Sequence, residues 1–207
     1  MANNFRTDQE RFWAGEFGDA YIERNVEDQI VAGNTALFAR ALARVGPISS
    51  VIEFGANIGL NLRSLKHLYP EAALSGVEIN AQAATVLRSL IGPENVHEGS
   101  ILDLQLDRQS DVALIKGVLI HMNPEVLQEV YEKLFQAASK YILICEYYNP
   151  SLVVVNYRGH HERLFKRDFA GEILDKFPST RLLDYGFVYR RDPTFPLDDI
   201  TWFLLSK

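Results

Sequence analysis

The sequence predicts an α/β fold with an open, mostly parallel sheet of seven strands, and two observations support this. From residue 48 onward, short runs rich in β-branched residues alternate with longer segments of helical periodicity, which is typical of β-α-β units. The last two apolar runs are separated only by a loop, so we expect them to be antiparallel neighbours at the end of the sheet. A chain of 207 residues is long enough for one such domain and short for two.

The first 46 residues are predicted to be mainly helical. Thr7–Trp13 can form one helix, and Asn34 can cap a second helix that ends near Gly46. Between these helices, the segment Trp13–Tyr21 is aromatic and is interrupted by glycine. This pattern favours a loop of defined shape over an element of the core.

The remaining chain supplies the sheet and the helices that cover it. The strands are expected at Ser49–Phe54, Ala73–Ile79, Asn95–Glu98, Val112–Lys116, Tyr141–Tyr147, Arg181–Tyr189 and Ile200–Leu205. The helices are expected at Gly59–Leu68, Ala81–Ile91, Pro124–Ser139 and about Arg167–Phe177. The start at Pro124 is well marked, because Asn123 can act as the N-cap and proline suits the first helical position.

Composition and charge are those of an ordinary globular protein. The chain has 21 Lys and Arg against 27 Asp and Glu, a net charge of −6, which argues against a surface built for nucleic acid. The single cysteine, Cys145, lies in an apolar run and is predicted to be buried and inert, and no Cys or His spacing predicts a metal site. Because neither a signal peptide nor a membrane span is visible, we expect a cytoplasmic protein that binds no membrane.

The strongest functional signal is the turn after the first strand. An apolar strand leads through Glu53 into a turn at Gly55 and then into a helix that begins near Gly59. The free N–H groups of such a turn suit an anion, but the G-x-x-x-G spacing is looser than the G-x-G-x-x-G of pyrophosphate-binding turns. S-adenosylmethionine (SAM) fits this pattern, because its methionyl carboxylate and ammonium need a looser turn with an acceptor such as Glu53 nearby.

Two further features follow at the next strand ends. Glu78 comes about 20 residues after the glycine turn, where a carboxylate can accept both ribose hydroxyls. Ser100 and Ile101 follow the third strand, where a small polar residue and an aliphatic neighbour can bracket adenine. The three features together predict a SAM site, with another nucleotide-type ligand as the alternative. The predicted cofactor-binding residues are Trp13, Tyr21, Glu53, Gly55, Ala56, Asn57, Asn61, Glu78, Ile79, Ser100, Ile101, Lys116 and Gly117.

Candidate catalytic residues follow the fourth and fifth strands. His121 can act as a general base for a hydroxyl nucleophile, although it can equally pack under the cofactor and fix the loop. Tyr148 and His160 are the other candidates. The Asp/Asn-Pro-Pro-aromatic signature of many enzymes that methylate exocyclic amines is missing after the fourth strand, so that chemistry is disfavoured.

The segment Tyr157–Asp168 is the concentrated basic stretch of an acidic protein. Its arginines can bind a carboxylate or phosphate in bidentate fashion, which predicts an anionic small-molecule substrate, although a solvated helix start with ordinary ion pairs is equally compatible. The predicted substrate-binding residues are Phe17, Glu146, Tyr147, Asn149, Tyr157, Arg158, Arg163 and Arg167.

Several segments together carry a family resemblance. They are Phe12–Gly18 (FWAGEFG), Tyr21–Asn25 (YIERN), Lys116–Pro124 (KGVLIHMNP), Tyr157–His160 (YRGH), Arg163–Glu172 (RLFKRDFAGE) and Asp184–Phe187 (DYGF). In these segments, which extend over nearly the whole chain, the sequence resembles small bacterial methyltransferases known as pseudaminic-acid-biosynthesis-associated methylases.

The resemblance implies a Rossmann-like, seven-stranded class I methyltransferase sheet with an N-terminal helical lid. Residues 1–46 would form the lid and residues 47–207 the SAM-binding part of one structural domain. The aromatic residues Trp13, Phe17 and Tyr21 could exclude water from the sulfonium and offer it cation–π contacts, or could simply anchor the N-terminal helices.

The leading hypothesis is therefore O-methylation of an anionic, sugar-like or other small polar metabolite. N- or carboxyl-methylation of a small molecule and a non-catalytic SAM-binding module remain the alternatives. We expect SAM as the cofactor, no metal, no nucleic acid, and a monomer or a homodimer.

Overall fold

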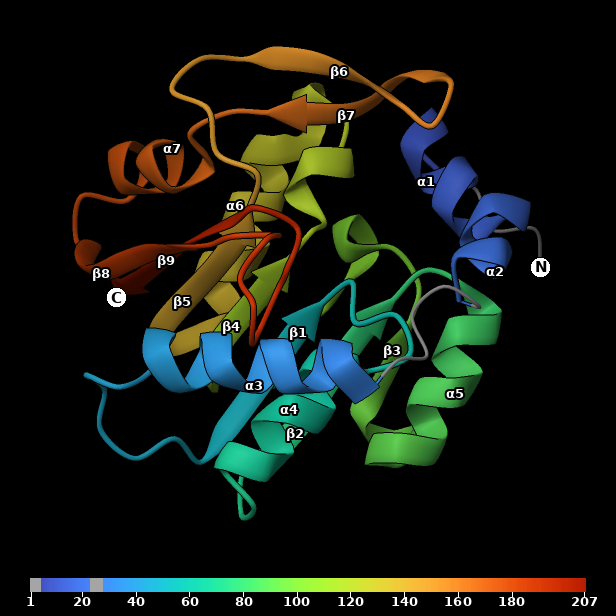
Figure 1. Ribbon diagram of the computed structural model, residues 1–207. Coiled ribbons are helices and arrows are strands. Elements are labelled where there is room, and N and C mark those ends of the chain that lie inside the picture. The colour runs from blue at the N-terminus through green and yellow to red at the C-terminus, as the bar shows by residue number, and fades with distance from the viewer. Residues whose placement is uncertain (1–4, 23–27) are drawn as a thin grey trace.

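The computed structural model describes residues 5–22 and 28–207. Its centre is a seven-stranded sheet in the order β3-β2-β1-β4-β5-β9-β8 (Figure 1). The strands are β1 (Ser50–Phe54), β2 (Ala73–Glu78), β3 (Val96–Glu98), β4 (Ser110–Lys116), β5 (Ala138–Glu146), β8 (Arg181–Val188) and β9 (Ile200–Ser206). The first five strands pair in parallel, and β9 is antiparallel to both β5 and β8, as the sequence predicts.

Helices cover both faces of this sheet. The α-helices are α1 (Asp8–Ala14), α2 (Glu16–Ile22), α3 (Asp28–Ala41), α4 (Leu60–Leu68), α5 (Ala81–Ile91), α6 (Leu127–Ala137) and α7 (Phe169–Lys176). Short 3-10 turns lie at η1 (Pro93–Asn95), η2 (Ile101–Asp103), η3 (Leu119–His121) and η4 (Pro124–Val126). Buried residues of α3, α4 and α5 form one core with one face of the sheet, and those of α6 and α7 form a second core with the other face.

The alternation of side chains along the strands explains these two cores. In β1, Val51 packs into the α3–α4–α5 core, whereas Ile52 and Phe54 pack into the α6–α7 core. The central strands β1 and β4 are buried on both faces and are therefore mainly apolar, whereas the edge strands β3 and β8 are largely exposed.

The predicted boundaries of the sheet elements and their helices differ from the observed ones by at most three residues. Asn123 is the N-cap that the sequence predicts, since its Oδ1 accepts a hydrogen bond from the Glu125 N–H at 2.9 Å, but the first turn is a 3-10 turn before α6 continues.

Three elements differ from the sequence expectation. The helix expected at Thr7–Trp13 is α1, but the following segment, expected as a shaped loop, forms a second short helix, α2, after Gly15. Asn34 is not a cap but a buried residue in the middle of α3. The basic stretch, for which a solvated helix start was one of two interpretations, mostly forms the hairpin of β6 (Val153–Tyr157) and β7 (His160–Lys166), a separate two-stranded sheet at the top of Figure 1.

The hairpin arises from a local signal that the charge of the stretch obscures. Tyr157 pairs with His160, so the turn consists of Arg158 and Gly159, with φ angles of 51° and 86°. Two positive φ angles define a type I′ turn, whose twist matches that of the flanking strands, and glycine adopts the second position without strain. In Figure 1 this turn lies next to α1.

Among the described residues, no helix combines the length and apolar character needed to cross a membrane. Glu23, Arg24 and Asn25, which belong to the family resemblance, lie outside the described residues.

Candidate functional site

A cavity of about 440 Å³ opens at the carboxyl ends of the parallel strands. Its wall is made by the loops after β1, β2, β3 and β4, together with α1, α2, α3, the β6–β7 turn and the segment before β9. The sheet order reverses between β1 and β4, and ligands of open α/β sheets bind at such a switch point. Every predicted cofactor-binding residue except Glu53 lines this cavity.

The turn after β1 brings backbone close to the cavity. Both Gly55 N–H and Ala56 N–H donate to the Val77 carbonyl of β2 at 2.9 Å. Gly55 has a φ of 73°, and a Cβ at this position would lie 2.5 Å from Val118 Cγ2. The position therefore requires glycine for both its conformation and its space.

Glu78 joins the first two strand ends. Its Oε2 accepts a hydrogen bond from the Asn57 N–H at 2.6 Å, and its Oε1 accepts one from the Asn80 N–H at 2.8 Å. Only 7% of Glu78 is exposed, and burial raises its pKa. Each oxygen retains capacity for a further donor, so the carboxylate is held in place yet can still bind a ligand.

Glu53 lies behind the wall and does not line the cavity. Its Oε1 accepts a hydrogen bond from Asn61 Nδ2 at 2.5 Å, and burial raises the pKa of Glu53 to about 8. Glu53 therefore does not lie where the predicted direct contact with the cofactor would require it. Position 53 points to the same face of β1 as Val51, into the layer between sheet and helices, so Glu53 orients Asn61 instead.

Several amide side chains of the wall have an unpartnered oxygen. Gln9, Asn34, Asn57 and Asn61 all line the cavity, and the buried side-chain oxygen of each lacks a hydrogen-bond partner among the described residues. Buried polar atoms are normally satisfied, so these acceptors indicate a ligand that brings donors. Asn34 and Gln9 were missed from the sequence, because a polar residue within a helical pattern gives no sign of which way it faces.

His121 lies in the cavity wall with one ring nitrogen already engaged. Its Nδ1 is 2.5 Å from the Arg163 carbonyl oxygen, which can only accept, so Nδ1 carries the hydrogen and Nε2 keeps its lone pair. The ring lies 4.7 Å from the Trp13 ring and 4.8 Å from the Tyr157 ring, between centroids. Burial lowers the pKa of His121 to about 4, so the imidazole is neutral at pH 7.

An aromatic cluster connects the N-terminal helices to the hairpin. Phe12 stacks on Phe17 with 4.1 Å between ring centroids, and His160 lies 5.0 Å from Phe12 and 5.8 Å from Phe17. Phe17 also contacts Tyr157, which itself lines the cavity. Phe17 and His160 therefore belong to this cluster and not to the cavity wall.

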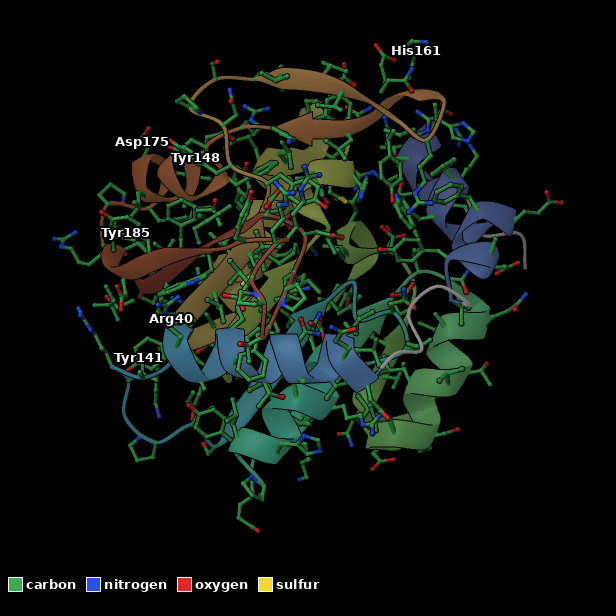
Figure 2. All side chains as sticks on the ribbon, viewed as in Figure 1. Arg40, Tyr141, Tyr148, His161, Asp175 and Tyr185 are labelled. Atoms are coloured by element: carbon green, nitrogen blue, oxygen red, sulfur yellow. The ribbon has the colours of Figure 1, made fainter. Side chains whose placement is uncertain are left out.

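The segment after β5 is only partly in the site. Tyr147 lines the cavity, but Tyr148 and Asn149 do not. Tyr148 is exposed beside Phe203 and, in Figure 2, lies near α7 on the opposite side of the molecule from α1 and α2. Both residues follow the end of β5, and only Tyr147 is directed to the cavity.

Glu146 is buried and supports the loop after β4. Its Oε1 accepts hydrogen bonds from the Val118 and Leu119 N–H groups, both at 2.9 Å, and burial raises its pKa to about 7. Its side chain is not part of the cavity lining, contrary to the expectation of substrate contact.

Of the three arginines predicted to bind substrate, the structure brings only Arg158 to the cavity. The Arg163 guanidinium lies 5.3 Å over the Phe12 ring, and Arg167 is paired with Glu172 at 2.5 Å. Arg158 and Lys116 line the cavity, and neither forms an ion pair with any residue in the described ranges. Asp198, which sequence reasoning missed, adds an acidic group to the same wall.

The part of the chain that the structure describes contains no group of three or more His, Cys, Asp or Glu side chains arranged to hold a metal ion. Cys145 is fully buried, and burial raises its pKa, which fits the predicted inert thiol.

No protein-family model matches the chain, and a search of curated proteins found no match either. Solved structures do match. A SAM-dependent methyltransferase from Leishmania major is 16% identical with a TM-score of 0.69, over 96% of this chain and 86% of that one. Magnesium protoporphyrin IX methyltransferase from Synechocystis PCC 6803, with bound SAM, is 13% identical with a TM-score of 0.66, over 99% of each chain.

A third similar structure is 1,6-didemethyltoxoflavin-N1-methyltransferase from Burkholderia thailandensis, with bound 1,6-didemethyltoxoflavin and S-adenosylhomocysteine. It is 16% identical with a TM-score of 0.67, over 96% of this chain and 86% of that one. The match in fold, together with the strand order, confirms the predicted architecture. This chain has the Rossmann-like α/β fold of the class I SAM-dependent methyltransferases.

Proposed function

We propose that this protein is a SAM-dependent methyltransferase that methylates an oxygen of an anionic, sugar-like or other small polar metabolite. One observation carries the proposal. A buried carboxylate, Glu78, is hydrogen-bonded to the turn after β1 and lines a cavity that also has unpartnered acceptors on Asn34, Asn57 and Asn61. The structural neighbours that carry SAM or S-adenosylhomocysteine in the same fold support it.

The residues present fit SAM at both of its polar ends. The methionyl ammonium has three N–H donors, which the amide oxygens of Asn34 and Asn61 can accept. The ribose has two hydroxyl donors, which the remaining lone pairs of Glu78 can accept. When bound, SAM would supply an electrophilic methyl group for an in-line displacement, in which positioning provides most of the rate.

The residues around the acceptor would then do three things. The neutral His121 can take the hydroxyl proton at Nε2, since Nδ1 is held by the Arg163 carbonyl. Trp13, Tyr21 and Tyr157 line the cavity and exclude water from it. Arg158, a cation without an ion pair in the described structure, can bind an anionic group of the acceptor.

The β6–β7 turn brings Arg158 to the cavity, and its φ of 51° belongs to the type I′ turn that joins the two strands. The family resemblance to pseudaminic-acid-biosynthesis-associated methylases points to the same acceptor class.

Isothermal titration calorimetry with SAM and S-adenosylhomocysteine tests the proposal. We expect both to bind, and Glu78→Gln to weaken both by about tenfold or more, because the ribose loses its charged acceptor. No binding of either compound to the wild-type protein at about millimolar concentration would refute the SAM site.

A screen for labelled-methyl uptake by acidic sugars, nucleotide sugars and small carboxylic or phosphonic acids identifies the acceptor. Mass spectrometry of the product distinguishes O-methylation from the alternatives of N- or carboxyl-methylation. SAM binding without uptake by any acceptor would favour a regulatory SAM-binding module.

A further inference from the structure

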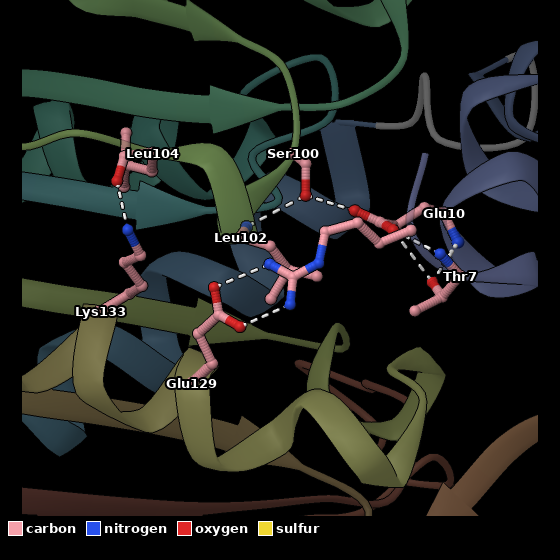
Figure 3. A network of polar contacts seen from close by, with 8 residues as sticks. Thr7, Glu10, Ser100, Leu102, Leu104, Glu129 and Lys133 are labelled. Carbon is pink, nitrogen blue, oxygen red and sulfur yellow. Dashed lines mark hydrogen bonds and ion pairs between the residues drawn. The ribbon is translucent and has the colours of Figure 1, made fainter. Parts of the chain in front are cut away.

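Glu10 is a buried carboxylate on α1 to which the sequence assigns no role. It lines the cavity and is 5% exposed. Figure 3 shows its contacts: the Ser100 hydroxyl donates to Oε1, and Oε2 accepts from the Thr7 N–H at 2.8 Å and the Thr7 hydroxyl at 3.2 Å. The pair Thr7 and Glu10 forms a capping box at the start of α1.

This carboxylate has one acceptor position to spare. The two oxygens of a carboxylate offer roughly four lone-pair positions, and the three hydrogen bonds above use both of those on Oε2 and one on Oε1. No described residue forms an ion pair with Glu10. A buried carboxylate needs donors to offset its lost hydration, so the remaining position on Oε1 suits a ligand N–H group.

The place of Glu10 in the cavity defines which part of the ligand it meets. Ser100, its hydrogen-bond partner, follows β3, the strand next to β2 and its Glu78. If Glu78 holds the ribose, the base of the cofactor lies toward Ser100 and Ile101, beside Glu10. The exocyclic amine is the N–H donor that adenine presents in its base plane.

We propose that Glu10 is a specificity residue for the cofactor: its carboxylate accepts a hydrogen bond from the exocyclic amine of adenine, and this contact also fastens α1 over the cavity. The inference rests on the proposed function, because it assumes a bound adenosyl group. It adds a residue from the N-terminal segment, 90 positions away from Ser100 in the chain.

Helices α1 and α2 and the β6–β7 hairpin cover the cavity, and we call them its roof. A contact between Glu10 and the cofactor would connect the cofactor to this roof, because Glu10 lies on α1. Trp13 follows Glu10 by one helical turn and contacts His121. Other polar contacts of this segment join protein to protein: Arg6 binds Glu129 through two hydrogen bonds of 2.9 and 2.8 Å, and Gln9 Nε2 donates to the Glu162 carbonyl at 3.1 Å. A contact from Glu10 to adenine would make closure of the roof depend on the cofactor.

Paired calorimetric titrations with S-adenosylhomocysteine and S-inosylhomocysteine test the inference. The second compound has a carbonyl oxygen in place of the amine, and this oxygen would face the Glu10 carboxylate. We expect wild-type protein to bind it at least about tenfold more weakly. In Glu10→Gln the amide N–H₂ can donate to that carbonyl, so we expect the ratio of the two dissociation constants to fall to roughly threefold or less.

Two variants serve as matched controls. Arg6→Ala breaks the ion pair between the segment before α1 and Glu129 of α6 and leaves the Glu10 carboxylate in place, so the ratio should stay at the wild-type value. Gln9→Ala removes the neighbouring unpartnered oxygen and should also keep the ratio. A ratio that is unchanged in Glu10→Gln, or that collapses in Gln9→Ala instead, overturns the assignment to Glu10.

Hydrogen exchange of wild-type protein gives a second measurement that needs no variant. S-adenosylhomocysteine should slow exchange in residues 5–22, and S-inosylhomocysteine at equal saturation should slow it less. Equal protection by both would contradict the coupling to α1. If neither compound binds at all, the proposed function fails, an outcome distinct from binding without discrimination.

Discussion

Three buried glutamates hold the loops that line the cavity. Glu53 fixes the Asn61 amide, Glu78 accepts from the Asn57 and Asn80 backbone, and Glu146 accepts from the backbone after β4. Burial raises the pKa of each. Glu53 and Glu146 position these residues from behind the wall, whereas Glu78, like His121 and Arg158, also lines the cavity itself.

Replacement of His121 tests its proposed role as the base. If Nε2 accepts the acceptor's proton, His121→Ala should lower kcat by about 10²–10⁴-fold and leave cofactor affinity unchanged. The base must be neutral, and its pKa lies near 4, so kcat/KM should show no acidic limb at pH 6.5 from this group. Near-normal turnover by His121→Ala would leave the residue only a packing role under the cofactor.

Arg158 and Arg163 form a matched pair on the same hairpin. Because Arg158 lines the cavity, Arg158→Ala should raise the KM of an anionic acceptor by about tenfold or more, with little effect on SAM affinity. The Arg163 guanidinium lies over Phe12 outside the cavity, so Arg163→Ala should leave that KM within about twofold. Equal losses in both variants, measured by initial rates, would indicate that the hairpin has a structural and not a binding role.

At the scale of elements, the roof of the site is made by two segments far apart in the chain. Helices α1 and α2 meet the β6–β7 hairpin through the aromatic cluster around Phe12 and Phe17. No residue of α1 or α2 belongs to either of the two buried cores in the described structure. The roof can therefore loosen without unfolding the sheet.

At Gly18, α2 packs tightly against the end of α1. A Cβ at this position would lie 1.9 Å from the Trp13 carbonyl oxygen and 2.8 Å from Asn80 Nδ2. Gly18→Ala should force the two helices apart, speed hydrogen exchange in residues 5–22 and weaken S-adenosylhomocysteine binding, with little change in the free energy of unfolding.

Gly46 provides the control for this prediction. A Cβ at Gly46 would meet nothing within 4 Å, so Gly46→Ala should leave both exchange and binding near wild-type values. Wild-type binding by Gly18→Ala would show that the packing of α1 on α2 does not matter to the cofactor.

At the scale of the whole molecule, the cavity and the cores share the same strands. Glu53 occupies the core-facing side of β1, so a group of the site also influences global stability. Its pKa is raised from 4.5 to about 8, so between these pH values the unfolded chain has released a proton that the folded chain retains. Unfolding then releases a proton, and the stability of the ligand-free protein falls as pH rises through this window.

Glu53→Gln should remove this contribution and keep the hydrogen bond from Asn61. The free energy of unfolding of the variant minus that of wild type should therefore increase between about pH 5 and pH 8, by on the order of a few kcal/mol. Urea unfolding at the two pH values measures this difference. Burial also raises the pKa of Glu146, but this residue is present in both proteins, so its contribution cancels in the difference. A difference that does not change with pH would contradict the prediction.

Sequence periodicity predicts most of this fold because strands and helices are encoded locally. Most strands of the main sheet are short apolar runs followed by a turn signal, and the predicted bounds of all seven lie within three residues of the observed ones. The β6–β7 hairpin was missed because β6 is largely exposed and the charged residues of β7 obscure its two buried residues, Leu164 and Phe165. The helix α2 was missed because glycine and aromatic residues, which here pack helix against helix, suggest a loop.

The amino-acid sequence by itself determined the parallel sheet, the glycine turn after β1 and the placement of Glu78, Ser100 and Lys116 around one cavity, because the carboxyl ends of parallel strands meet at one edge of a sheet. Only the tertiary structure decided which other side chains reach that cavity. Glu10, Gln9, Asn34 and Asp198 come from α1, α3 and the segment before β9. Their positions depend on how distant segments pack against one another, and no local pattern records that packing.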